Sequence, residues 1–465
     1  MASQIALILL SQNTQASLIL GRVTDESGEP IETAHVKIKG EDEEYLTDTQ
    51  GYFSILDRSK KAMITAWKEG YYIGTASIKK PQIQLRRLPK DNPNYQFIHP
   101  SKHPDVSKRC INCHKKTVEV WEQHNHSKGI KNPVFLALKK AFEQDYPHSQ
   151  GSCNSCHAPK SAQAVSCDVC HKINSFDAEK TGHGIDRYKL LRPPKGSELV
   201  IGPLKDVTRG HDTFSKVFKS SEQCAGCHSA KHHGKETYDT YTQWLDSPAK
   251  KTGKICQDCH MPHPQKKRPI AHGPSAIVRN PQSIRNHLDP TRSLDTRKKF
   301  IKMKLSTKLR GHQLDVKVSV TNLNDAHSFP SGSPFRNAFV NLSAFLEDGS
   351  LLKQSSGPTL PFSKKSGFLL ARIFKPRFLI GQYKSGATRK YNSWGEFFWW
   401  PFSLKSDTRL FPGKTRTESF SFFIKKKTKV TIKAELIYQR YFKEMGEAYH
   451  LPNSSETIKS ISQSI

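Results

Sequence analysis

The sequence has no long apolar stretch and few apolar residues overall. Hydrophobic residues occupy 35% of its 465 positions. No run approaches the roughly 18 consecutive apolar residues that a membrane-spanning helix needs, so the residues predict no membrane span. Such a composition also limits the hydrophobic core that side chains alone can build.

Acidic residues are scarce as well. The chain carries 42 Asp and Glu against 73 Lys and Arg, which gives a formal net charge of +31. This excess favours acidic partners, namely an anionic redox protein, anionic lipid or an acidic cell-surface polymer. Nucleic acid is a weaker alternative, because the sequence contains no recognition motif for it.

No cysteine lies outside one repeated pattern. All ten cysteines belong to five Cys-x-x-Cys-His motifs. In chain order the motif residues are Cys110, Cys113 and His114; Cys153, Cys156 and His157; Cys167, Cys170 and His171; Cys224, Cys227 and His228; and Cys256, Cys259 and His260.

This spacing is typical of covalent haem c attachment. Two thiols add to the two vinyl groups of one porphyrin, and two intervening residues let both sulfurs reach one edge of the ring. The next residue then lies under the iron, where its imidazole becomes the proximal ligand. The motifs therefore predict five covalently bound haems c.

Two other uses of paired cysteines fit less well. A zinc ribbon needs its Cys-x-x-Cys pairs two by two and has no use for a His after every pair. Five pairs would leave one unmatched. A disulfide framework would not place His after each pair either.

Attachment to this motif takes place after export, so an export signal is expected. The apolar run at 5–10, followed by small residues around Ala16, resembles a short signal peptide with its cleavage site. No Lys or Arg precedes the run. We expect residues 1–17 to be a signal peptide and the protein to be periplasmic or extracellular.

The remaining pattern predicts a multidomain fold. Apolar and polar residues alternate across 18–90 and again across 300–465, which is typical of β-sandwiches. Residues 100–290 hold all five motifs, with about 38 residues per haem, too few for a conventional core. We expect this pentahaem domain to consist mostly of short helices and irregular segments packed around the haems.

The first of these segments resembles the carboxypeptidase regulatory-like domain family. The resemblance covers about 70 residues, and such domains bind or space rather than catalyse. It rests on Gly21-Arg22-Val23, Gly28-Glu29-Pro30-Ile31, Ala34-His35-Val36 and Thr47-Asp48-Thr49-Gln50-Gly51-Tyr52-Phe53.

From residue 100 to about 275 the chain resembles the multihaem cytochrome c-554 family, tetrahaem electron carriers of the nitrogen cycle, and its larger relatives. The resemblance is carried by the first motif with Trp121-Glu122-Gln123-His124-Asn125-His126, by Val165-Ser166 before the third motif, by Ser220-Ser221-Glu222-Gln223 before the fourth, and by Trp244-Leu245-Asp246-Ser247-Pro248 before the fifth.

The resemblance implies a set of distal iron ligands. His126 corresponds to the distal ligand of the third haem, with His124 as a rival, and His183 to that of the first haem. His211, upstream of the fourth motif, is a third candidate. His272 lies in a His-Gly turn like the one that follows the last motif in larger relatives.

The second haem has no distal protein ligand in the tetrahaem carriers. Here the loop around His327 looks like the His-x-Phe/Leu-Pro-x-Gly loop of β-domains fused to multihaem cytochromes, and it could supply one. Further histidines remain competitors for these positions, namely His103, His148, His232, His233, His263, His287 and His312.

The favoured function is electron transfer along closely spaced haems. One alternative is an oxidoreductase that acts on a small nitrogen or sulfur compound at one five-coordinate haem. A second alternative is a subunit of an extracellular conductive assembly, suggested by the flanking β-domains and by the aromatic cluster of Trp394, Phe397, Phe398, Trp399 and Trp400.

Overall fold

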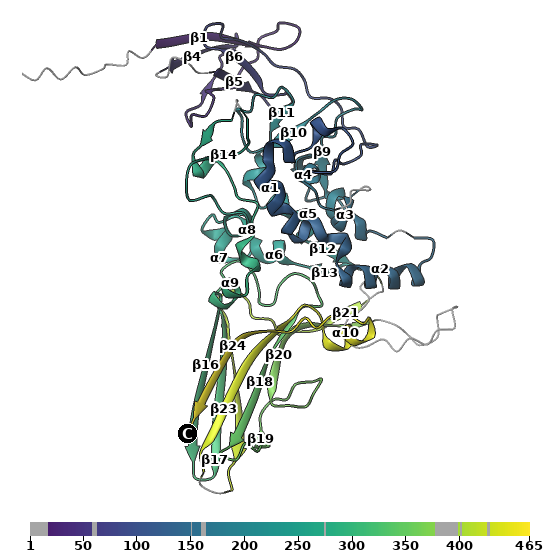
Figure 1. Cartoon of the computed structure of the whole chain (residues 1–465), viewed down its shortest axis with the longest axis vertical. Coiled ribbons are helices and arrows are strands. Elements are labelled where there is room, and N and C mark those ends of the chain that lie inside the picture. Colours follow the sequence, from purple (N-terminus) through teal and green to yellow (C-terminus); the bar gives the residue numbers. More distant parts are fainter. Residues whose placement is uncertain are drawn as a thin grey trace, which may run out of the picture.

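The computed structural model describes residues 17–57, 63–149, 151–159, 164–273, 276–376, 399, 402–425 and 428–465. The chain forms two β-rich ends with a region of short helices between them (Figure 1). It is therefore multidomain, as the sequence predicted, and it has many β-sheets and few helices. The expected signal peptide lies almost entirely outside the described residues, as does the aromatic cluster apart from Trp399.

The N-terminal end is built from two small sheets, ordered β4-β1-β7 and β3-β2-β5-β6. Inward-facing residues such as Val23, Val36, Ile64 and Leu85 are fully buried between them. The strands are β1 (Ser17–Thr24), β2 (His35–Ile38), β3 (Tyr45–Leu46), β4 (Tyr52–Asp57), β5 (Met63–Trp67), β6 (Gly74–Ser77) and β7 (Gln82–Gln84).

The middle region contains the five motifs on short helices joined by loops and small two-stranded ladders. Its α-helices are α1 (Ile111–Gln123), α2 (Pro133–Asp145), α3 (Cys153–His157), α4 (Cys167–Cys170), α5 (Glu222–His228), α6 (Thr240–Leu245), α7 (Pro248–Lys251) and α8 (Cys256–His260). Its 3-10 helices are η1 (Val106–Lys108), η2 (Asn125–Lys131), η4 (Gly184–Arg187), η5 (Lys216–Lys219), η6 (Pro281–Ser283) and η7 (Pro290–Arg292). Its strands are β8 (Ile173–Phe176), β9 (Tyr188–Leu190), β10 (Val200–Gly202), β11 (Asp212–Phe214), β12 (Ala230–His232), β13 (Lys235–Tyr238), β14 (Arg268–Pro269) and β15 (Val278–Arg279).

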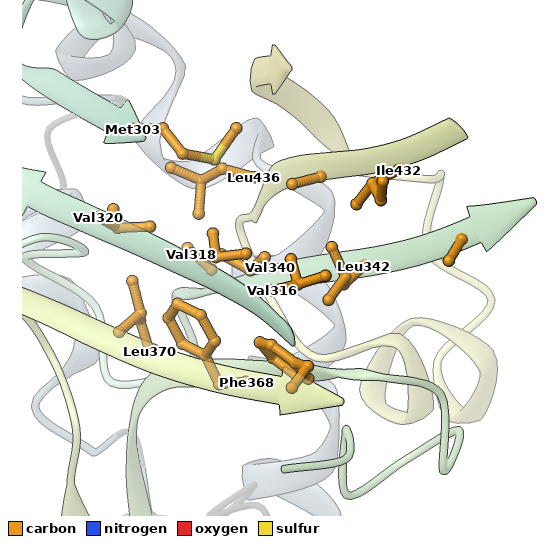
Figure 2. Close-up of a cluster of buried hydrophobic side chains, with 14 of the residues drawn as sticks. Met303, Val316, Val318, Val320, Val340, Leu342, Phe368, Leu370, Ile432 and Leu436 are labelled. Atoms are coloured by element: carbon orange, nitrogen blue, oxygen red, sulfur yellow. The ribbon is translucent and has the colours of Figure 1, made fainter. Parts of the chain in front are cut away.

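The C-terminal end is a larger sandwich of two sheets, ordered β16-β17-β22-β19 and β21-β20-β18-β23-β24. Alternating Val, Leu and Ile side chains from both sheets meet in its core (Figure 2). The elements are α9 (Leu294–Lys299), β16 (Ile301–Arg310), β17 (Gln313–Asn322), β18 (Asn337–Leu346), β19 (Gln354–Ser356), β20 (Gly367–Pro376), β21 (Phe402–Asp407), β22 (Thr415–Phe423), β23 (Val430–Gln439), α10 (Lys443–Ala448) and β24 (Glu456–Ser464).

Buried polar contacts join both ends to the middle region. At the N-terminal junction, Asp206 pairs with Arg279 and accepts a hydrogen bond from the backbone N–H of Gly40. At the C-terminal junction, Asp239 lies 3.2 Å from Arg372 and 2.8 Å from Arg409, and all three side chains are buried. Ion pairs of this kind fix the geometry of a junction, because an unpaired charge left there would be costly.

Candidate haem site

Each Cys-x-x-Cys-His motif lies on, or at the start of, a short helix. Residues three and four apart on a helix share one face. The two cysteines and the following histidine are therefore presented together, as α3 and α8 show, since each consists of a whole motif. The first motif begins at the N-cap of α1, and the fourth ends α5.

All five motifs open onto one cavity of about 2370 Å³. Its walls include all ten motif cysteines and all five motif histidines, and every cysteine is a free thiol. A large cavity lined mainly by apolar surface and by every attachment residue fits a set of porphyrins. The residues present thus match the cofactor that the motifs predict.

The Nδ1 atoms of three motif histidines have hydrogen-bond partners. His114 Nδ1 lies 2.7 Å from the carbonyl oxygen of Ile270, and His171 Nδ1 lies 2.6 Å from that of Ile201. His260 Nδ1 lies 3.2 Å from a carboxylate oxygen of Asp289. A proton held on Nδ1 leaves the Nε2 lone pair free for a metal and fixes the ring orientation.

Burial also favours the neutral form of several imidazoles. It lowers the pKa of His228 and of His327 to about 4. His260 differs from these two. Burial, the largest single effect, lowers the pKa of its imidazole, but the hydrogen bond to Asp289 and the negative charge of that carboxylate together outweigh burial and raise this pKa. Only a neutral imidazole can coordinate iron through Nε2.

Two motif histidines each lie near another imidazole ring. The ring centroids of His126 and His228 are 6.3 Å apart, and those of His260 and His327 are 6.5 Å apart. Two imidazoles that held one iron from opposite sides would have ring centres about 6 Å apart, because each metal–nitrogen bond would be about 2 Å and each nitrogen lies about 1 Å from its ring centre. Both pairs have that separation.

These pairs differ from the assignments that the resemblance implied. His126 lies opposite the fourth motif rather than the third, and His327 lies opposite the fifth rather than the second. The loop that carries His327 is held beside the fifth motif by polar contacts. Ala249 N–H donates to the carbonyl of Asp325 at 3.0 Å, and Ser328 N–H donates to Gln243 Oε1 at 2.8 Å.

The other expected ligands, His183, His211 and His272, also line the cavity. Among the described ring contacts, none of the three has a motif histidine about 6 Å away. His183 stacks on His232 at 4.5 Å. The next residue, Gly184, packs closely on Ser155 of the second motif: a Cβ added to this glycine would lie 2.1 Å from the carbonyl oxygen of Ser155. The loop that carries His183 therefore lies against the second motif rather than the first. His211 is 3.2 Å from Glu198.

His272 is exposed, and its backbone N–H donates to the carbonyl of Cys113, beside the first motif. Among the competitors, His103, His232 and His287 line the cavity, and so does His124. His263 Nδ1 is hydrogen-bonded to the carbonyl oxygens of Pro281 and Ile284. His312 Nδ1 is hydrogen-bonded to the carbonyl oxygen of Ile424.

Thiol contacts reveal how the motifs are ordered in space. Three pairs of cysteines from different motifs interact, and each hydrogen bond lowers the pKa of one thiol and raises that of the other. The pairs are Cys110 with Cys167, Cys156 with Cys227, and Cys256 with Cys224. Cys170 of the third motif also lies close enough to Cys224 and Cys227 to raise their pKa electrostatically, after the larger effects of thiol pairing and burial.

In the part of the chain that the structure describes, no helix combines the length and apolar character needed to cross a membrane. No protein-family model matches the chain, and no curated protein sequence matches it either.

Among solved structures, the chain is similar to a penta-haem cytochrome c552 from Thermochromatium tepidum. The match covers 77% of this chain and 97% of that chain, with a TM-score of 0.56 and 20% sequence identity. The PapD-like domain 7 of human CEP192 matches 36% of this chain and 82% of its own length, with 7% identity and a TM-score of 0.15, which is too low to carry an argument. At 20% identity the first match establishes the fold alone, and that fold is the fold of a multihaem cytochrome.

Proposed function

We propose that the chain is a pentahaem c-type cytochrome that transfers electrons outside the cytoplasm. The ten motif cysteines would hold five haems as thioethers, and the five motif histidines would be their proximal ligands. Haem iron bound in this way alternates between the ferric and ferrous states and so carries single electrons. The similarity of fold to a solved penta-haem cytochrome and the single cavity lined by all five motifs support this proposal.

The observation that carries the proposal is the separation of about 6 Å within two pairs of imidazoles, His126 with His228 and His260 with His327. An iron held by both imidazoles of such a pair would have no position left for a substrate. This arrangement would favour an electron carrier over a catalyst.

We further propose His183, His211 and His272 as ligands of the remaining irons. His232 and His287 are rivals, because both line the cavity and burial lowers the pKa of each to about 4. His287 lies near His171 and His114, so it would serve the third or the first motif.

The finer assignments rest on the sequence. This proposal has four finer parts. They are a relation to the cytochrome c-554 family, a carboxypeptidase regulatory-like module at 18–90, export by an N-terminal signal peptide, and acidic redox partners. The small sheets packed around Val23 and Val36 agree with a compact β-module.

The alternative function, an oxidoreductase that acts on a small nitrogen or sulfur compound, would require one iron with an open position. The ring of Phe135 lies 4.4 Å from that of His157, too close for a porphyrin to lie between the two rings. Phe135 therefore packs on the proximal imidazole and does not mark such a position.

The test is haem stoichiometry combined with electron paramagnetic resonance (EPR) of the purified holoprotein. We expect five haems per chain, low-spin signals throughout, and no spectral change on addition of cyanide or nitric oxide. Fewer than five haems would contradict the attachment proposal. A high-spin signal that disappears when cyanide binds would replace the pure carrier with the oxidoreductase.

A further inference from the structure

The five motifs form a row with one branch. Thiol contacts join the first motif to the third and the fourth to the fifth, and the third motif lies against the fourth. The second motif joins the row from the side, through Cys156 and Cys227. The first motif is therefore one end of the longest paths through the site, which lead from it to the second and to the fifth motif.

Side-chain exposure distinguishes the first and fifth motifs from the others. Cys113 of the first motif and Cys259 of the fifth have exposed side chains, whereas the other eight cysteines are half-buried. Electron exchange with another protein requires a cofactor near the surface. Lys115 and Lys116, which are exposed and follow the first motif on α1, also place that motif near the surface.

Four exposed lysines lie in the two chain segments that contact His114 of the first motif or follow it directly. Lys115 and Lys116 are exposed and follow His114 directly on α1. Lys266 and Lys267 are exposed in the segment that leads to Ile270, whose carbonyl oxygen holds His114 Nδ1 at 2.7 Å. We call these four lysines the basic rim.

Acidic side chains near the basic rim offset little of its charge. Residues 262–273 contain three basic residues and no Asp or Glu. On the α1 side, Asp105 is paired with Lys108 at 3.6 Å, and Glu122 accepts a hydrogen bond from Ser101. Glu119 is exposed, as a single negative charge among the lysines.

The fifth motif has a different charge pattern. Asp258 pairs with Arg285 at 2.8 Å, and Asp325 pairs with Lys254 at 2.6 Å. These two carboxylates therefore offset part of the positive charge near the fifth motif, to which Lys250 and Lys251, exposed on α7, also contribute. The two motifs differ in how far carboxylates offset the lysines beside them.

We propose that the basic rim docks an acidic redox protein, which exchanges electrons with this chain at the first motif. This inference rests on the proposed electron-transfer function. In each transfer toward the chain, the partner loses one electron and thereby reduces one ferric haem to the ferrous state. No bond forms or breaks, and no proton is transferred.

Charge complementarity selects this partner because exposed lysines act over about one Debye length, roughly 10 Å at 0.1 M salt. Over that range they raise the rate of encounter with an anionic surface more than they raise the final affinity. The effect of the basic rim should therefore be measurable in the association rate constant and in the dependence of that constant on salt concentration.

The experiment follows reduction of the oxidised holoprotein by a small, acidic, reduced [2Fe–2S] ferredoxin in a stopped-flow instrument. The rim variant is Lys115→Glu with Lys267→Glu; neither side chain lines the cavity. The matched control is Lys308→Glu with Lys317→Glu, which makes the same charge change on exposed positions of β16 and β17. Both variants are compared at low and high salt.

We expect the rim variant to lower the second-order rate constant about tenfold at low salt and to flatten its salt dependence. The control should stay within about twofold of the unaltered chain. Equal slowing in both variants would overturn the proposal, since net charge alone would then explain the effect. An unchanged rate in the rim variant would overturn it too.

Reduction by dithionite separates this proposal from the underlying function. A holoprotein that dithionite cannot reduce would contradict electron transfer itself. If dithionite reduces all variants equally and ferredoxin also reduces them equally, the docking proposal is contradicted but the electron-transfer function is not. If the variant with Lys115→Glu and Lys267→Glu binds less haem, the single variant Lys115→Gln replaces it in the comparison. We then expect a smaller decrease in the second-order rate constant, because only one positive charge is removed.

Discussion

The imidazole rings of His260 and His327 have centroids 6.5 Å apart and planes inclined by 22°. One belongs to the fifth motif, and the other is carried by a loop of the C-terminal sandwich. Two distant parts of the chain thus meet in a geometry that suits one iron. This relationship makes the role of the sandwich directly testable.

His327→Ala should leave the iron of the fifth motif with one protein ligand. We expect about one-fifth of the low-spin haem signal to become high-spin, with haem content unchanged, because the thioethers and His260 remain. EPR and visible spectra measure the conversion. His312→Ala is the control, since its Nδ1 lies 2.7 Å from the carbonyl of Ile424 and the residue lies outside the cavity lining. A low-spin spectrum in His327→Ala would refute the ligand assignment.

His126→Ala should have the equivalent effect at the fourth motif, where this imidazole faces His228. His124→Ala is the matched comparison, because both rings line the cavity and lie 4.6 Å from each other. We expect high-spin haem in the first variant and an unchanged spin state in the second. The reverse result would make His124 the ligand.

The two facing pairs should also differ in their EPR spectra. The imidazole planes are inclined by 59° for His126 and His228 but by 22° for His260 and His327. Nearly parallel imidazoles split the iron dxz and dyz orbitals strongly, whereas a larger angle reduces the splitting and raises the largest g value. The low-spin signal lost in His126→Ala should therefore have a larger maximum g value than the signal lost in His327→Ala.

Asp289→Asn should raise the reduction potential of the fifth haem. The carboxylate accepts a hydrogen bond from His260 Nδ1, which makes the imidazole a stronger donor and favours ferric iron. We expect an upward shift on the order of 50 mV in one component of a potentiometric titration. Asp295→Asn, at an exposed carboxylate of α9, should shift no component. Equal shifts in both variants would point to a general charge effect.

The junction with the C-terminal sandwich should weaken in acid. Burial opposes ionisation of Asp239, but hydrogen bonding to Arg409 and the charge of Arg372 outweigh it and lower the pKa of this carboxyl. A lowered folded-state pKa gives stability that is present above the pKa of an unfolded aspartate, about 4, and is lost as the pH falls below it.

Asp239→Asn tests this dependence. Removing one partner of a buried ion pair should cost about 3 kcal/mol of unfolding free energy at pH 7. The variant should also lose part of the pH dependence between pH 5 and about 3, as measured by denaturant unfolding. Asp348→Asn, at an exposed turn, is the control. Identical pH profiles for the unaltered chain and Asp239→Asn would contradict the assignment.

The sequence predicted much of this architecture because the signals were local. Each Cys-x-x-Cys-His motif is complete within five residues, and α3 and α8 place it on one helical turn. Alternation of apolar residues in β17 and β23 likewise follows from the chain itself. The similarity to a penta-haem cytochrome agrees with the multihaem fold that the motifs predicted.

The distal ligands were harder to assign because they depend on contacts between remote segments. His126 is close in sequence to the first motif, yet its ring faces His228, and a resemblance to tetrahaem carriers suggested the third haem. His232 and His287 had no local signal to separate them from histidines outside the cavity. Their burial arises only once the loops around the motifs have packed together.

The position of His327 has a consequence for the order in which the protein is completed. Because a chain is synthesised from its N-terminus, all five attachment motifs exist before this histidine does. The fifth iron would therefore wait for its second ligand until the sandwich had folded and docked through Asp325 and Ser328. A chain that stopped short of the sandwich could bind its full complement of haems and still lack a finished terminal site.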